Sequence, residues 1–306
     1  MKVIHKNKPM TLAELDRKFP TEDACRSYLC ARRWPNGVKC PRCEHDQVYE
    51  LASKPHHWQC HNCAPQGYRF SVLVWTIFEN TNVPLIQWFK VIYLMLSSKK
   101  GISALQVQRM MGFGSYHTAH KMCHKVRVAM GNIDFHQLVG FVEVDETFVG
   151  GKAKNRHKNK RGGPGGTGSA GGTGGHGKQI VIGAVQRKGN VIARVIQSLD
   201  GTTLRNFVRE AVSHKVSLVS TDERRGYNSI DREYPRKSVD HWNGEYVHGN
   251  VHTNTIEGFW SIVKRGIVGT FHKVSAKYLP LYVNEFEFRY NNRNNADIFG
   301  AAIKGC

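Results

Sequence analysis

A helical pattern of apolar and polar positions opens the chain. Residues 11–34 are predicted to form two short helices, because Thr11 and Glu14 have the spacing of a capping box and Thr21 precedes a second amphipathic run. Residues 36–70 break this pattern with turn residues and short β-like pieces such as "QVYEL" and "HHWQC". A small β-structure therefore follows the two helices.

The helical pattern returns from Val83 to about Met130. Within this stretch, two helix-length segments are joined by the glycine-containing turn "GFGS" (112–115). This arrangement is typical of a helix-turn-helix, and it is equally typical of a plain helical hairpin that links two domains. The sequence leaves both interpretations open.

After Gly131 the pattern changes to that of an α/β protein. Strands are predicted from β-branched apolar runs, and one amphipathic helix begins with threonine; the strands are 141–149, 178–187, 191–199 and 216–222, and the helix is 202–212. Further helices are predicted from Thr253 onward. This order favours a mixed sheet with helices packed on its faces.

These changes of pattern divide the chain into four expected parts. They are a helical segment (1–35), a cysteine-rich part (36–78), a helical part that includes the possible helix-turn-helix (79–135) and an α/β domain (136–306) with an insert at 152–177. The expected fold class is therefore α/β (α+β) in several domains. A chain of 306 residues is long enough for this organisation.

Two C-x-x-C pairs predict a metal site in the cysteine-rich part. The pairs are Cys40 with Cys43 and Cys60 with Cys63. Each pair suits a tight turn that presents two thiolates, and two such turns complete one closed, tetrahedral structural Zn²⁺ site. The other cysteines are interpreted as buried or incidental thiols: Cys25, Cys30, Cys123 and Cys306.

The charge of the chain indicates a polyanionic partner. There are 44 Lys and Arg against 24 Asp and Glu, a formal net charge of +20, with a pI near 9.7. Nucleic acid is the usual partner of such a chain. The N-terminus has no apolar stretch like that of a signal peptide, and the most apolar segment, residues 83–98, is too short to span a bilayer. We expect no membrane partner, and a location in the cytoplasm with the nucleoid in a bacterium or in the nucleus of a eukaryote.

The insert at 152–177 has a basic part followed by a glycine-rich part, 162–177, which reads as a flexible linker. The basic part holds DNA-binding candidates: Lys152, Lys154, Arg156, Lys158, Lys160 and Arg161. It contacts a phosphate backbone or is only a solvated loop. Lys264 and Arg265, farther along the chain, are further candidates for DNA contact.

Three acids stand where catalysis on DNA would need them. Asp145 lies in the first predicted strand of the α/β part, Asp222 ends a later strand, and Glu257 lies near the start of a helix. Phosphodiester cleavage can use two Mg²⁺ ions, which carboxylate oxygens hold. Lys264 follows Glu257 by two helical turns and can grip a neighbouring phosphate from the same face. The alternative is that these are ordinary surface carboxylates.

Five stretches resemble the DDE-type insertion-sequence transposases that carry an N-terminal zinc ribbon, the ISXO-like group related to the Merlin transposases. They are "CPRC…CHNC", "VEVDETFVGGK", "STDERRGYN", "VHTNTIEGFWSIVKRGIVGTFHKVS" and "YLPLYVNEFEFRYNNR". They occur in the family's order and cover nearly the whole chain. The block "HTNTIEGFWSIVKRG" is the most specific of them.

The resemblance implies a ribonuclease H-like catalytic domain in which Asp145, Asp222 and Glu257 hold two Mg²⁺ ions, with Mn²⁺ as a substitute, and in which Lys264 is the family's lysine. It implies a DNA transposase that binds the double-stranded ends of its element, cuts them to expose a 3′-OH and joins that hydroxyl to target DNA. Because two ends must meet, at least a dimer is expected. The alternative functions are a domesticated, non-catalytic DNA-binding protein and a zinc-ribbon transcription factor.

Several neighbours of these acids have two interpretations each. On a strand, Glu143 shares a face with Asp145, so it either supports the metal ligand indirectly or pairs with a basic residue, whereas Glu146 points to the other face and is interpreted as structural. The segment 252–254 either caps the helix that carries Glu257 or contacts DNA. Trp260 either belongs to the core or stacks on a base.

Overall fold

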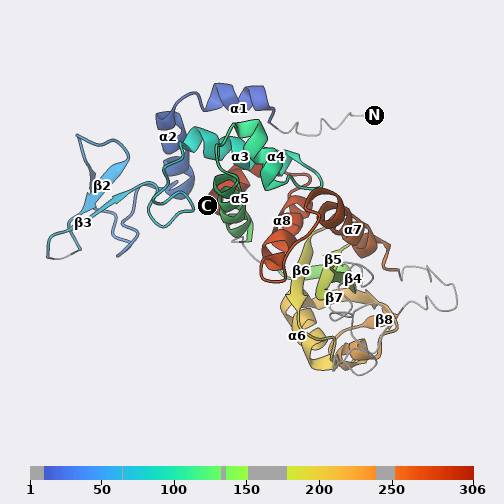
Figure 1. The fold of residues 1–306 in the computed structure, drawn as a ribbon. Coiled ribbons are helices and arrows are strands. Elements are labelled where there is room, and N and C mark those ends of the chain that lie inside the picture. Colours follow the sequence, from blue (N-terminus) through green and yellow to red (C-terminus); the bar gives the residue numbers. More distant parts are fainter. Residues whose placement is uncertain (1–9, 64, 132–135, 151–177, 239–251) are drawn as a thin grey trace, which may run out of the picture. The chain divides into compact units, whose positions relative to one another are not determined.

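The computed structural model describes residues 10–63, 65–131, 136–150, 178–238 and 252–306 (Figure 1). The chain divides into two compact units, one of residues 1–133 with 292–306 and the other of residues 134–291. The whole insert at 152–177 lies outside the described residues, and so do six of the predicted DNA-binding side chains: Lys152, Lys154, Arg156, Lys158, Lys160 and Arg161.

The first unit begins with two capped helices, α1 (Leu12–Lys18) and α2 (Glu22–Arg33). The predicted capping box is present, because the Glu14 N–H donates to Thr11 Oγ1 over 3.2 Å and the Thr11 N–H donates to Glu14 Oε2 over 2.6 Å. Thr21 caps α2 in the same way as Thr11 caps α1. The sequence prediction of both helix starts is confirmed.

A three-stranded antiparallel sheet follows these helices, formed by β1 (Val48–Glu50), β2 (His57–Cys60) and β3 (Tyr68–Ser71) in that order. Trp58 of β2 stacks on Phe70 of β3 with ring centroids 5.9 Å apart, and Trp34 packs edge-on against Trp58. Trp58 and Phe70 are both buried, so these rings supply apolar packing to the small sheet.

The rest of the first unit is helical, with α3 (Leu85–Ser97), α4 (Ala104–Met111), α5 (Tyr116–Gly131) and α9 (Ile298–Lys304). Gly112 ends α4 in the left-handed conformation, with φ of 67°, and the chain turns directly into α5. The short helix, glycine turn and longer helix fit both a helix-turn-helix and a plain helical hairpin, the two interpretations that the sequence leaves open. Within the described residues, no helix combines the length and apolar content that a membrane crossing requires.

The C-terminal segment belongs to the first unit. Phe299 of α9 packs against Phe89 of α3 with ring centroids 5.4 Å apart. Arg32 of α2 pairs with Asp297, which caps the start of α9. Residues 292–306 therefore complete the core that α2 and α3 begin.

The second unit contains a five-stranded mixed sheet in the order β6-β5-β4-β7-β8. Its strands are β4 (Leu138–Val149), β5 (Gln179–Gln186), β6 (Val191–Ile196), β7 (Val212–Thr221) and β8 (Arg236–Ser238). The central strand β4 is antiparallel to β5 and parallel to β7. The expected mixed sheet is confirmed, and its order agrees with the ribonuclease H-like architecture that the resemblance implies.

Helices cover both faces of this sheet. One face packs against α6 (Gly201–Ala211) and the short helix η3 (Arg225–Ile230), and the other packs against α7 (Asn254–Arg265) and α8 (Leu279–Asn291). The alternation of β4 separates its side chains accordingly. Val142 and Val144 join the core under α6, so Glu143 and Asp145 are directed to the α7 side.

Candidate active site and metal centre

Two neighbouring parallel strands bring Asp145 and Asp222 together. Glu143 of β4 is in register with Ser220 of β7, and the two aspartates lie two residues farther along their chains. Asp145, Asp222 and Glu146 each offer a carboxylate oxygen, and these oxygens all lie within 4.8 Å of one another. The sequence predicted the first two of these three acids.

The helix α7 adds Glu257 and Lys264 to the same region. An open cavity of about 460 Å³ is lined by side chains from the end of β4 and from one face of α7: Asp145, Glu146, Thr147, Glu257, Trp260, Ser261, Lys264 and Arg265. Glu257 and Lys264 are both exposed. The cavity therefore joins Asp145 to both residues that the sequence proposed on this helix, and Asp222 lies beside Asp145.

The crowding of acids has an electrostatic consequence for Asp145. Burial, and then the charges of Glu146 and Asp222, raise the pKa of the Asp145 carboxyl to about 7, against a hydrogen bond from Trp260 that lowers it. Such a group is costly to ionise without a nearby cation. Clustered carboxylate oxygens are the ligands of Mg²⁺ and Mn²⁺, so the donor set fits the divalent ions that the resemblance implies.

Trp260 contacts Asp145 because β5 has a glycine at the right position. Gly183 is paired with Asp145 across the β4–β5 ladder. A Cβ atom at residue 183 would lie 2.8 Å from the Trp260 ring, whereas the glycine leaves room for the indole Nε1–H to donate to Asp145 Oδ2 over 3.1 Å. Trp260 is only 3% exposed, so the prediction that it belongs to the core is confirmed. Its hydrogen bond to the acid was not foreseen.

Glu146 belongs to the carboxylate cluster, although the alternation of side chains along the strand directs it to the other face from Asp145. Its Oε2 accepts a hydrogen bond of 2.8 Å from Tyr227 Oη, and its Oε1 lies 2.5 Å from Arg224 Nε. Burial, followed by the charge of Asp222, raises the pKa of the Glu146 carboxyl. Arg224 and Tyr227 both come from the segment after β7, which brings Glu146 and Asp222 to the same end of the sheet. The alternation of side chains along β4 cannot predict this contact, because it depends on how a distant segment packs against the strand.

The start of α7 is capped in an unexpected way. Thr253 occupies the N-cap position, but its side chain caps no helix N–H. Its hydroxyl instead donates to Glu257 Oε1 over 3.0 Å. The expectation that the segment 252–254 caps α7 through its own side chains is therefore wrong for Thr253. Glu143 pairs with a basic residue, Arg187, as one of its two interpretations predicted.

The four cysteines of the two C-x-x-C pairs form a second cluster, in the first unit. Their Sγ atoms all lie within 4.8 Å of one another, with separations of 3.5 Å for Cys43–Cys63, 3.6 Å for Cys43–Cys60 and 3.8 Å for Cys40–Cys63. A tetrahedral zinc site with Zn–S bonds of about 2.3 Å has sulfur–sulfur edges of about 3.8 Å. The cluster therefore fits a structural Zn²⁺ ion.

The thiols of the cluster differ in pKa when no metal is bound. A backbone hydrogen bond at His45 is the largest effect on Cys43 and lowers the pKa of that thiol to about 6, whereas burial, followed by hydrogen bonding with Cys43, raises the pKa of the Cys60 and Cys63 thiols. The thiolate is the form that binds zinc. Outside the cluster, burial raises the pKa of the Cys25 thiol to about 12, which agrees with its interpretation as a buried, unreactive group.

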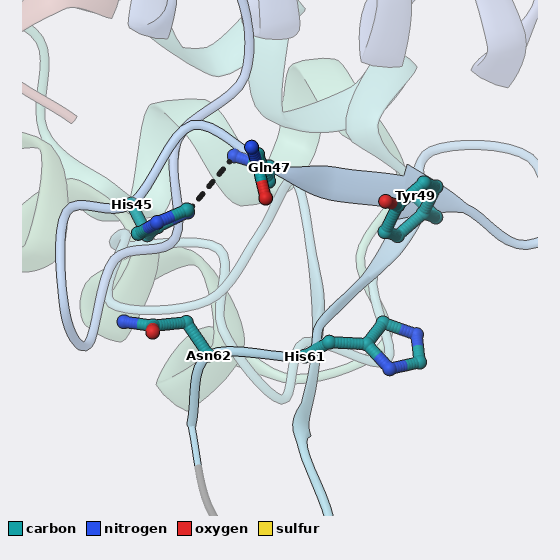
Figure 2. A pocket seen from close by; sticks show the side chains of 5 residues that line it. All are labelled: His45, Gln47, Tyr49, His61 and Asn62. Carbon is teal, nitrogen blue, oxygen red and sulfur yellow. Dashed lines mark hydrogen bonds between the residues drawn. The ribbon is translucent and has the colours of Figure 1, made fainter.

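A hollow of about 370 Å³ lies where β1 begins and β2 ends (Figure 2). It is lined by His45, Gln47, Tyr49, His61 and Asn62. The Tyr49 ring is 60% exposed and meets the His61 ring edge-on, and the Asn62 amide donates to Cys43 Sγ. Among the described residues, the lining holds two carboxamides, two imidazoles and an aromatic ring, but no carboxylate, lysine or arginine.

Comparison with known proteins places these two clusters in a family context. Residues 137–291 match the ISXO2-like transposase domain, and residues 20–66 match the transposase zinc-ribbon domain. An uncharacterized protein in the transposable element ISH50 of Halobacterium salinarum is 30% identical over 276 residues, which cover 89% of this chain and 92% of that protein. The ribbon match includes all four cysteines of the cluster and all five residues of the hollow, and the domain match includes the acid cluster.

The cysteine cluster predicts a measurable zinc content. Purified protein should hold one zinc ion per chain, and Cys60→Ser should lose it, because three thiolates do not close the tetrahedral site. Without the metal, β1–β3 should unfold, since zinc supplies the folding energy of such small sheets. Zinc is measured by atomic emission. The control Cys30→Ser changes a cysteine outside the cluster and should keep the metal; full zinc content in Cys60→Ser would contradict the assignment.

The raised pKa of Asp145 predicts that its charge destabilises the metal-free protein. Because the folded-state pKa is about 7 and the ordinary value is 3.8, the stabilising contribution of this group is complete below pH 4 and is lost as the pH rises through 7. Asp145→Asn should therefore stabilise the protein at pH 8 in EDTA and not at pH 4. The gain in the free energy of unfolding at pH 8 has an upper limit of about 4 kcal/mol, and it is measured as a higher melting temperature. Exposed Asp46→Asn is the control; equal pH profiles for wild type and Asp145→Asn would refute the prediction.

Proposed function

The chain belongs to the ISXO2-like (IS1595) family of DDE transposases, and we propose that it catalyses the DNA steps of transposition itself. In this proposal the protein binds the double-stranded ends of its insertion sequence, cleaves them to expose a 3′-OH and transfers that hydroxyl to target DNA. Both steps depend on Mg²⁺, with Mn²⁺ as a substitute. The membership of the family implies transposition; the DNA cleavage and end binding are our proposal.

One observation carries the catalytic part: Asp145 clusters with Asp222 and lines an open cavity that Glu257 also lines. Asp145 comes from β4, Asp222 follows β7 and Glu257 comes from α7. Bound divalent ions would supply activation of the attacking oxygen and stabilisation of the leaving oxygen. In this assignment the three acids hold those ions, and Glu146 either adds an oxygen or keeps its contact with Arg224.

Lys264 and Arg265 have the position of phosphate-binding residues in this scheme. Both are exposed, and both line the cavity on the last turn of α7. A lysine there opposes the negative charge of a DNA strand whose scissile phosphate lies among the acids. The net charge of +20 would bring DNA to such a surface from a distance.

We propose that the hollow on the zinc ribbon helps to recognise the base sequence of the DNA ends. Carboxamides such as those of Gln47 and Asn62 form paired hydrogen bonds with adenine edges, and the exposed ring of Tyr49 can pack on a base or a thymine methyl group. Because no charged side chain other than histidine lines the hollow, contact with base edges suits it better than contact with phosphates. The helix pair α4 and α5, interpreted as a helix-turn-helix, is a second candidate DNA-binding surface in the same unit.

The alternative is a domesticated protein that binds DNA without cutting it. It is less well supported, because a protein without catalysis has no use for mutually repelling carboxylates that destabilise the fold. The need to bring two DNA ends together leads us to propose at least a dimer in the DNA complex.

The catalytic assignment is tested on duplexes that carry the terminal inverted repeats of the element. Asp145→Ala, Asp222→Ala and Glu257→Ala should each lower Mg²⁺-dependent nicking and strand transfer on the order of 10³-fold, since each removes a metal ligand whose contribution is several kcal/mol. The control is Glu210→Ala, which removes a half-exposed carboxylate of α6. Unchanged nicking in the Asp145 and Glu257 variants would contradict the assignment. If the wild-type protein binds these ends but never nicks them, the alternative of a domesticated DNA-binding protein is favoured.

The ribbon assignment is tested by selection from a randomised duplex library. Wild type should recover a sequence motif, and Gln47→Ala should lose preference at one or a few positions, with a cost of about 1–3 kcal/mol on the best sequence and an unchanged salt slope. Gln66→Ala is the matched control, because Gln66 is an exposed glutamine of the same ribbon outside the hollow. If both variants recover the wild-type motif, the hollow does not read the bases.

A further inference from the structure

Glu143 is a fully buried carboxylate between the central strand and α7. Its side chain is 0% exposed. An ionised carboxylate in such a place destabilises the fold strongly unless it is paired and hydrogen-bonded. Its two oxygens accept hydrogen bonds from the backbone of α7, from a threonine hydroxyl and from the Arg187 guanidinium, so the group is well satisfied in its position.

The first turn of α7 provides the most informative of these contacts. The N–H groups of Thr255 and Ile256 donate to Glu143 Oε2 over 2.8 and 3.1 Å, and the Thr255 hydroxyl donates to Glu143 Oε1 over 2.9 Å. Thr255 and Ile256 are the second and third residues of the helix, whose N–H groups an N-cap side chain normally satisfies. Glu143 therefore caps α7 from a strand more than a hundred residues earlier in the chain.

The backbone at Thr253 explains why a distant residue has this task. Thr11 and Thr21 cap their helices from extended conformations, with ψ of 164° and 159°. Thr253 has φ of −118° and ψ of 13°, outside the extended region that N-cap residues adopt. Its hydroxyl is turned to Glu257, and the helix N-terminus is left to the carboxylate of Glu143, which the helix dipole also favours.

Arg187 and His252 complete the attachment. Arg187 Nε donates to Glu143 Oε1 over 2.7 Å, and a second guanidinium nitrogen of Arg187 donates to the His252 carbonyl over 3.1 Å. His252 Nδ1 lies 3.1 Å from the same Glu143 oxygen. The residue directly after β5 and the segment that leads into α7 are thus held by one carboxylate.

This attachment sets the spacing of the proposed catalytic acids. Glu143 and Asp145 are two residues apart on the same face of β4, and Glu257 directly follows the Ile256 N–H that Glu143 holds. A displacement of the start of α7 moves Glu257 relative to Asp145. It also moves Trp260, whose indole is hydrogen-bonded to Asp145.

We propose that Glu143 is a positioning residue that fixes the distance between Asp145 on β4 and Glu257 on α7. The inference rests on the proposed function, because it presupposes that these two acids hold divalent ions together. Glu143 itself is no metal ligand, since both of its oxygens are occupied by donors inside the fold. Its loss should weaken metal binding although every proposed metal ligand is still present.

The test compares Glu143→Gln with Val208→Ala. The glutamine keeps the shape and one acceptor oxygen but loses the charge that faces Arg187 and the helix N-terminus. Val208 is a buried residue of α6, on the opposite face of the sheet, so its truncation lowers stability without touching α7. Mn²⁺ binding without DNA is measured by electron paramagnetic resonance, and exchange of the α7 first-turn amides by hydrogen-exchange mass spectrometry.

We expect Glu143→Gln to weaken Mn²⁺ binding by about 10- to 100-fold, the range found when residues that orient metal ligands are replaced, and to speed exchange in the first turn of α7 by about tenfold. Val208→Ala should change neither quantity at α7. If Glu143→Gln binds Mn²⁺ as tightly as Val208→Ala does, the positioning role is overturned, even where exchange is faster, because Glu143 is then only a helix cap.

Asp145→Ala separates this inference from the proposed function. Loss of Mn²⁺ binding in Asp145→Ala, with retention in Glu143→Gln, leaves the proposed function standing and overturns the positioning role. Loss in both variants, with retention in Val208→Ala, supports both. Retention of Mn²⁺ binding in Asp145→Ala refutes the proposed metal site, and the positioning role then fails with it.

Discussion

The pairing of β4 with a strand on each edge is the constraint on which the second unit depends. The antiparallel ladder sets Gly183 opposite Asp145, and the parallel ladder leads Asp222 to the same end of the sheet. A slip of one residue in β4 would direct Glu143 and Asp145 into the apolar core under α6 and send valines to the α7 side. The register that builds the hydrophobic core is thus the same register that builds the acid cluster, and neither can change without the other.

Much of this arrangement could be predicted from local sequence. The caps at Thr11 and Thr21 depend on residues three positions apart, and the predicted strands follow from runs of β-branched residues, so short-range rules were sufficient. The spacing of Cys40 and Cys43 and of the second pair likewise encodes a turn that presents two thiolates. Asp145 and Glu143 were placed on one face by the two-residue period of a strand, but the choice of Asp145 as the metal ligand came from the resemblance.

The features that escaped prediction all depend on contacts between distant segments. Glu146 joins the acid cluster through Arg224 and Tyr227, about eighty residues away, and strand parity alone sets it apart. The cap of α7 is another case, because Thr253 is the residue type that a local rule selects and its backbone conformation prevents it from acting. The room that Gly183 leaves for an indole is invisible until two elements are packed together.

The return of the C-terminal segment to the first unit has an evolutionary consequence. Residues 292–306 close the helical core on α2 and α3, so the α/β unit is an insertion with two junctions to the rest of the chain. Replacing that unit by the corresponding part of a related element requires two crossovers within the gene. Both must preserve the packing of α9 against α2 and α3. A single crossover between the units would leave a chimera whose terminal helix meets an unfamiliar core.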